Sequence, residues 1–142
     1  MTPNVLTRAE RPVRLAEASL PYQLQSASVA RRLLRDKLAD SDLVHLADDA
    51  ELVLTELVSN AAKTGCLTTM QVSVAQVTNR VGRVVRIAVR DGSRTLPVLV
   101  TPGTGDESGR GLILVDRLAV VWGVELDARG KTVWADLSVE RV

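Results

Sequence analysis

Two polar side chains stand one helical turn apart in the segment ELVLTELVSNAAKTG, which spans residues 51–65. Glu56 and Asn60 flank an apolar stripe that could bury against other elements, formed by Leu54, Leu57, Val58 and Ala61. A carboxylate and an amide at this spacing could orient a water and hold Mg²⁺, which prefers oxygen ligands and usually keeps phosphates and waters as the rest. A solvated helix face is the competing interpretation, because short motifs often match by chance.

A second acid follows an alternating strand pattern. Val85, Ile87 and Val89 form the inward face of this strand, and Asp91 continues the same alternation before Gly92. A carboxylate next to a buried face needs hydrogen-bond donors, because an unpaired buried charge is costly. Asp91 could accept from the exocyclic amine of adenine. Ordinary turn chemistry of an Asp-Gly pair is the alternative.

A third feature is a pair of glycines at the start of an apolar-periodic segment. Gly109 and Gly111 bracket Arg110, and they follow a stretch without clear periodicity over residues 92–108. The free N–H groups of a helix N-terminus can bind an anion such as a phosphate. The P-loop pattern GxxxxGK[ST] is absent, and no strand leads straight into the glycines as a Rossmann fingerprint requires. Flexible-loop composition is the alternative.

The elements that must position these groups follow from the periodicity of apolar residues. A period of two predicts strands over 13–21, 69–77, 83–91, 122–127 and 131–139. A period of 3.6 predicts helices over 26–40 and 48–64, and a third that opens at Gly109. This order predicts an α+β fold, a two-layer α/β sandwich in which a mixed, mostly antiparallel sheet carries three helices on one face. Residues 1–12 are expected to be a flexible N-terminus, and residues 13–142 a single domain.

Composition narrows the class of function. A net charge of +1 and only 2% aromatic residues argue against nucleic-acid binding. Cys66 is the only cysteine, so neither a disulfide framework nor a cysteine metal site is expected. No apolar run approaches the roughly 18 residues of a membrane span, and no secretory leader is recognisable. A cytoplasmic protein without membrane partners is the expectation.

Taken together and in this order, the three features resemble the N, G1 and G2 boxes of the GHKL (Bergerat-fold) ATP-binding superfamily. The boxes are Glu56–Asn60, Asp91-Gly92 and the run from Gly109 to Leu112. The segments ELVSNAAKTG, VRDGS, SGRGLILVDRLAVVWGV and GKTVWADL look like those of short bacterial regulators related to anti-sigma-factor serine/threonine kinases. The resemblance covers about residues 13–139.

The resemblance implies a role for each matching residue. Asn60 would ligate the Mg²⁺ that bridges the phosphates of ATP, and Glu56 would orient or deprotonate the attacking hydroxyl. Asp91, with Gly92 beside it, would hold the adenine amine with support from Thr132. Residues 98–108 would form the ATP lid. The backbone N–H groups on the phosphates would come from Gly109, Arg110, Gly111 and Leu112.

The sequence departs from the family pattern at several places. Thr64 stands where the subgroup commonly has a histidine after the N box. Ser93 and Arg94 follow Asp91-Gly92 without the second glycine of the wider superfamily. The lid is short, so closure over the nucleotide could depend on a partner.

The function implied by the resemblance is an ATP-binding anti-sigma-factor-like regulator. It would act as an ATP-dependent serine/threonine protein kinase on an anti-anti-sigma partner. Expected partners are a sigma factor and a STAS-type anti-anti-sigma protein, and the homodimeric state of the relatives is carried over as an expectation. Two alternatives stay open: a non-catalytic, ATP-dependent protein-interaction module, and a degenerate scaffold that binds only proteins.

Overall fold

The structure is a computed structural model, which describes residues 13–23, 25–39, 41–64, 69–80, 82–93 and 107–140. Every predicted helix and strand is present. The strands are β1 (Val13–Pro21), β2 (Thr69–Asn79), β3 (Gly82–Asp91), β4 (Val121–Asp127) and β5 (Gly130–Ser138). The helices are α1 (Gln25–Ala39), α2 (Ala47–Thr64) and α3 (Glu107–Leu118), with a short 3-10 turn, η1 (Val44–Leu46), before α2. The N-terminal segment 1–12, predicted to be flexible, lies outside the described residues.

The five strands form one sheet in the order β1-β2-β3-β5-β4, and every pairing between neighbours is antiparallel. Strands β2 and β3 form an antiparallel hairpin, and Gly82 begins its second strand at φ 122°, a conformation that favours glycine. The predicted predominance of antiparallel pairs is confirmed, and the described strands contain no parallel pair that would make the sheet mixed. Helix α3 crosses over from β3 to β4, which run parallel, but β5 lies between them and is antiparallel to both.

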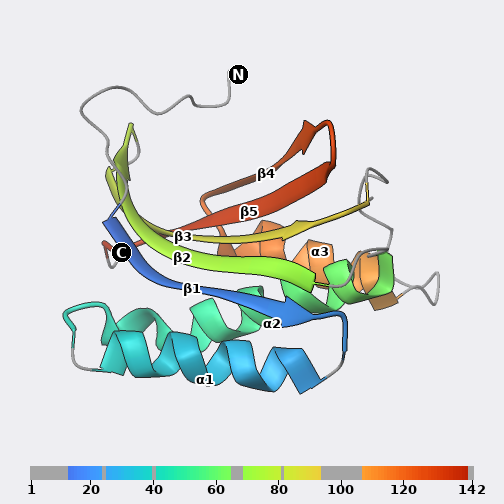
Figure 1. The fold of residues 1–142 in the computed structure, drawn as a ribbon. Helices are drawn as coiled ribbons and strands as arrows, with labels where there is room; N and C mark the ends of the chain where they lie inside the picture. Colours follow the sequence, from blue (N-terminus) through green and yellow to red (C-terminus); the bar gives the residue numbers. More distant parts are fainter. Residues whose placement is uncertain are drawn as a thin grey trace.

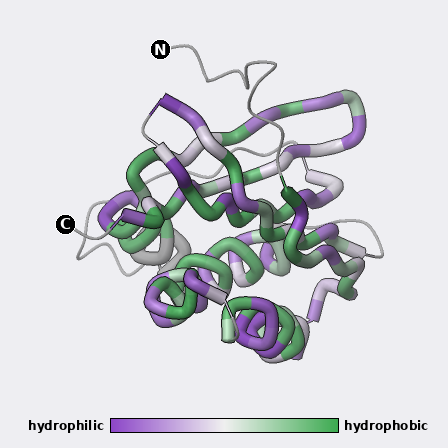
Figure 2. Tube along the Cα trace, turned by 90° about the vertical axis from the view of Figure 1, so that its left-hand side faces the viewer, coloured by the Kyte–Doolittle hydropathy of each residue, from purple (hydrophilic) through white to green (hydrophobic). Residues whose placement is uncertain are grey.

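The three helices lie on one face of the sheet, as predicted (Figure 1). Helix α2 occupies the middle of this layer, where it contacts α1, α3, β3 and β5. Its predicted apolar stripe is buried in the main core: Leu54, Leu57, Val58 and Ala61 are each at most 2% exposed. Hydrophobic and hydrophilic residues alternate along the strands and share each helix in Figure 2, as amphipathic elements require. No described helix has the length and apolar character to cross a membrane.

The outer face of the sheet carries a buried charged cluster that alternation alone does not predict. Arg86 points outward, because it alternates with the inward Val85 and Ile87, and its Nε and Nη2 atoms donate to the two carboxylate oxygens of Asp136 at 2.7 and 2.9 Å. Its guanidinium also lies 4.6 Å from the centre of the Trp134 ring. Asp136 and Trp134 are therefore 0% and 9% exposed although none of the described helices covers this face (Figure 1). Asn79 adds a hydrogen bond to Asp136 at 3.2 Å.

Candidate functional site

Helix α2 presents different polar residues to its two sides. Glu51 and Thr55 face α1, where both interact with Arg31. A turn of 3.6 residues places Glu56 and Asn60 on another flank of α2, away from these contacts. Glu56 is half-buried, and Asn60 is only 9% exposed. The solvated-face interpretation therefore does not describe Asn60, which is held against the interior by the same helix register that buries the apolar stripe.

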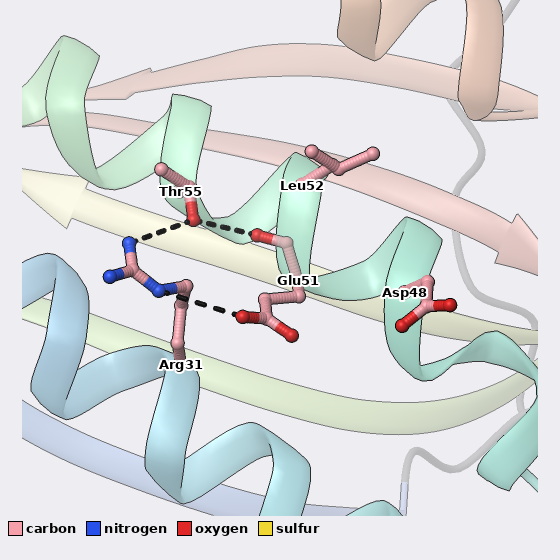
Figure 3. A pocket seen from close by; sticks show the side chains of 5 residues that line it. All are labelled: Arg31, Asp48, Glu51, Leu52 and Thr55. Atoms are coloured by element: carbon pink, nitrogen blue, oxygen red, sulfur yellow. Dashed lines mark hydrogen bonds and ion pairs between the residues drawn. The ribbon is translucent and has the colours of Figure 1, made fainter.

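A pocket of about 460 Å³ opens on the α1 side of α2 (Figure 3). Arg31, Asp48, Glu51, Leu52 and Thr55 line it, and none of these was a predicted site residue. Its charges are paired with one another: Arg31 Nε lies 3.6 Å from Glu51 Oε1, and Arg31 Nη1 donates to Thr55 Oγ1 at 3.4 Å. The pocket is thus a charged groove between α1 and α2, separate from the flank that carries Asn60.

The adjoining ion pairs extend this groove toward the solvent. The Arg35 guanidinium donates a hydrogen bond to the Glu51 carboxylate, and Asp48 Oδ1 lies 3.4 Å from the same guanidinium. These two acids raise the pKa of Arg35 above its ordinary value, chiefly through the hydrogen bond from Arg35 to Glu51. Because exposed ion pairs are screened by solvent, this network orients α1 on α2 and adds little stability.

Asp91 ends β3 on its inward face, as the alternation predicted, and is 3% exposed. Lys131 stands directly opposite Asp91 in the pairing of β3 with β5. Its ammonium lies 3.0 Å from Asp91 Oδ1 and 2.9 Å from Oδ2, and the whole residue is 0% exposed. The donor that a buried carboxylate requires is therefore a buried lysine.

The Asp-Gly turn adds further contacts to this carboxylate. The Ser93 N–H group donates to Asp91 Oδ1 at 2.7 Å, and the Gly92 N–H group donates to Tyr22 Oη at 3.1 Å. The turn chemistry that the sequence offered as the alternative is thus present, and recognition of adenine by Asp91 stays a prediction. Asp91 Oδ2 faces the Lys131 ammonium but accepts no hydrogen bond of suitable geometry from the described residues. One buried oxygen therefore keeps the capacity to accept.

The support expected from Thr132 is not found. Thr132 stands opposite Arg90, one position beyond Lys131, so its side chain lies on the other face of the sheet from Asp91. The residue that meets Asp91 is Lys131, which the sequence interpretation missed. The signal was present, since Lys131 continues the inward alternation of Val133 and the residues after it.

The phosphate end of the predicted site is the start of α3. This helix begins at Glu107, two residues earlier than predicted. Free N–H groups belong to about the first four residues of a helix, which include Gly109 and Arg110. Gly111 and Leu112 follow in the next turn, where N–H groups bond within a regular helix, so their predicted phosphate contacts are corrected to the first turn. Leu112 instead contributes a buried side chain, 2% exposed.

The topology brings these groups to one end of the sandwich. The end of β3, with Asp91, pairs beside the start of β2, which follows the C-terminal end of α2 that carries Asn60. Helix α3 leads into the start of β4, at the opposite end of the sheet, so its N-terminus lies at the Asp91 end (Figure 1). The predicted lid, residues 98–108, lies outside the described residues up to position 106.

The described residues contain no cluster of three or more His, Cys, Asp or Glu side chains arranged to hold a metal. Mg²⁺ that is bound mainly by phosphates and waters needs only one or two protein ligands. Asn60 as a metal ligand and Glu56 as its neighbour therefore stay predictions, consistent in chemistry with the oxygen donors that this ion prefers.

Residues 18–137 match a family model described as a histidine kinase-like ATPase domain. This span includes every residue assigned to the site, from Glu56 on α2 to Thr132 on β5. A comparison with curated proteins gives no match for the chain. The match covers most of the sandwich.

Proposed function

Because the chain belongs to the histidine kinase-like ATPase domain family, of the GHKL type, we propose that it binds ATP where Asn60, Asp91 and the start of α3 converge. The observation that carries this proposal is the buried Asp91 carboxylate, 3% exposed, with an oxygen that still has the capacity to accept. The exocyclic amine of adenine is a donor that would satisfy it. Oδ2 lies 2.9 Å from the Lys131 ammonium yet accepts no hydrogen bond from the described residues, so it can still take a donor from a ligand.

The other end of the nucleotide would meet two helices. The first-turn N–H groups of α3 would contact the phosphates, and the carboxamide oxygen of Asn60 would ligate Mg²⁺. Bound Mg²⁺ would neutralise the charge that develops on the phosphates. Glu56, half-buried and one turn before Asn60, would orient the attacking hydroxyl and accept its proton.

The reaction we propose is transfer of the γ-phosphoryl group to a serine or threonine of a protein partner. The hydroxyl oxygen forms a bond to the γ-phosphorus as the bond to the β-phosphate oxygen breaks, and ADP leaves. The resemblance to short regulators related to anti-sigma-factor kinases supports a STAS-type anti-anti-sigma protein as the substrate and a sigma factor as a second partner. A non-catalytic module, in which ATP only stabilises the partner-binding conformation, is the second candidate function.

Calorimetry with ATP·Mg²⁺ tests the binding proposal. Asp91→Asn should weaken binding by roughly 10-fold or more, since a hydrogen bond to a charged group contributes about 1.5–3 kcal/mol. Asp36→Asn, the same substitution on the exposed face of α1, is the matched control and should bind like the wild type. Equal affinities of all three proteins would reject Asp91 as the adenine residue.

A phosphotransfer assay separates the kinase from the module. At an ATP concentration of 100 times Kd, ligand binding should stabilise the fold by about 2.7 kcal/mol, and Asn60→Ala should remove this shift. Transfer to a cognate partner that Glu56→Ala abolishes would support the kinase. A thermal shift without any transfer would support the module, and no shift with any nucleotide would leave a scaffold that binds only proteins.

A further inference from the structure

Two residues of opposite charge meet in the interior at the proposed adenine end of the site. Lys131 is 0% exposed and Asp91 is 3% exposed. Lysine is almost never fully buried unless it is paired, and removing two charges from water costs more than burying an apolar pair of similar volume. A gain in stability is therefore a weak explanation for burying Lys131 against Asp91. The pair includes the carboxylate oxygen, Oδ2, that is proposed to accept from adenine.

The contacts of Lys131 fix the carboxylate rather than merely neutralise it. Its Nζ donates to Asp91 Oδ1 at 3.0 Å and to the Ser93 carbonyl at 3.4 Å. The Ser93 N–H group donates to the same Oδ1 at 2.7 Å. These three hydrogen bonds close a ring through the Asp-Gly-Ser turn, so the carboxylate cannot rotate without breaking them. The ring uses Oδ1, whereas Oδ2, which lies 2.9 Å from the same ammonium, accepts no hydrogen bond from the described residues.

The main chain of β5 reinforces the same position. A Cβ atom added to Gly130 would lie 2.0 Å from the Asp91 carbonyl oxygen and 2.9 Å from the Gly92 Cα atom. The start of β5 therefore approaches the turn as closely as a glycine allows. This approach sets the point from which the Lys131 side chain starts.

We propose that Lys131 is a positioning residue for nucleobase recognition, which holds the Asp91 carboxylate so that Oδ2 accepts from the 6-amino group of adenine. The proposal rests on the ATP binding proposed above. An ionised carboxylate only accepts hydrogen bonds, and the Lys131 ammonium lies 2.9 Å from Oδ2 and 3.0 Å from Oδ1. The Asp91–Lys131 pair is therefore matched to a base that presents a donor.

The test compares ATP with purine riboside triphosphate, which lacks only the 6-amino group. Calorimetry on the full chain gives the ratio of the two Kd values for the wild type, Lys131→Met and Lys37→Met. The last variant makes the same substitution on an exposed lysine of α1. The wild type should prefer ATP by roughly 10- to 150-fold, the equivalent of about 1.5–3 kcal/mol at 1.36 kcal/mol per tenfold.

Lys131→Met should bring the ratio close to one, chiefly by weakening ATP, whereas Lys37→Met should keep the wild-type ratio. A merely structural lysine would lower both affinities together and keep the ratio, and that result would overturn the proposal. Equal binding of both nucleotides by the wild type would overturn it while leaving nucleotide binding intact. Binding of neither nucleotide would overturn both this inference and the proposed function.

A measurement on the wild type keeps the proposal testable if Lys131→Met does not fold. The sequence has three lysines, at positions 37, 63 and 131, so the side-chain nitrogen resonances of ¹⁵N-lysine-labelled protein are few. ATP should shift the Nζ resonance of Lys131 further than purine riboside triphosphate does, because only ATP adds a donor to the paired carboxylate. Identical shifts with the two nucleotides would overturn the proposal.

Discussion

Replacing Arg86 with methionine would leave the Asp136 carboxylate buried without its strongest partner. The Asp136 side chain is 0% exposed and the Arg86 side chain is 21% exposed. The carboxylate is therefore fully shielded from water, whereas the guanidinium is partly solvated. Removing one partner of a buried pair costs about 3–5 kcal/mol, because the remaining charge is no longer compensated. Asn79 still donates to Asp136 at 3.2 Å, which favours the lower half of that range. Loss of the Arg86 contact with Trp134 adds about 0.5–2 kcal/mol.

Urea unfolding followed by tryptophan fluorescence measures this loss, since Trp134 lies directly beneath Arg86. Arg90→Met is the matched control on the same strand. Arg90 pairs with Asp127 at 3.0 Å, but the two side chains are 36% and 47% exposed, so this substitution should cost about 0.2–1 kcal/mol. Adding Asp136→Asn to Arg86→Met should recover part of the stability by removing the uncompensated charge. If the two arginine variants lose equal stability, burial does not govern the strength of the Arg86–Asp136 pair.

Three further substitutions test the packing around the site. Gly130→Ala forces a Cβ atom to within 2.0 Å of the Asp91 carbonyl oxygen, so unfolding measurements should show a loss of about 1–3 kcal/mol and calorimetry a weaker affinity for ATP. Tyr22→Phe removes the acceptor of the Gly92 N–H group and should cost about 0.5–1.5 kcal/mol in the same unfolding experiment. Leu57→Ala, in the core under α2, should cost about 2–5 kcal/mol yet leave the preference for ATP over purine riboside triphosphate unchanged. A changed preference in that variant would mean that core packing, and not the turn alone, sets base selection.

Local periodicity was sufficient to predict the elements, because each strand or helix shows its own period in a few residues. The stripe of α2 and the inward position of Asp91 both follow from counting along one segment. The sequence also indicated that Asp91 needs a donor. It did not identify that donor, because lysine is usually solvent-exposed and alternation within β5 does not fix which residue of β3 it faces.

The outer face of the sheet also shows that periodicity within one strand does not predict contacts with another strand. Alternation places Trp134 and Asp136 on the side of the sheet without helices, and it predicts that both face water. Their burial arises from Arg86, which stands directly opposite Asp136 in the register, about 50 positions away along the chain, and lies over the Trp134 ring. The start of α3 was placed two residues late because Gly109 and Gly111 are typical of a helix boundary, whereas the structure accommodates both glycines in its first turns.

Both buried ion pairs join β3 to β5, and together they restrict how these two strands can align. A shift of one residue would turn Val133 and its inward neighbours to the outer face, so the hydrophobic core excludes it. A shift of two residues keeps the faces, and hydrophobic alternation does not oppose it strongly. That shift would place Lys131 opposite position 89 or 93 and Asp136 opposite position 84 or 88, which separates both pairs at once and leaves buried charges on both faces of the sheet. The pairs therefore specify the one alignment that apolar residues cannot specify alone, and this alignment is also the one that sets Lys131 against the Asp91 carboxylate at the proposed base site.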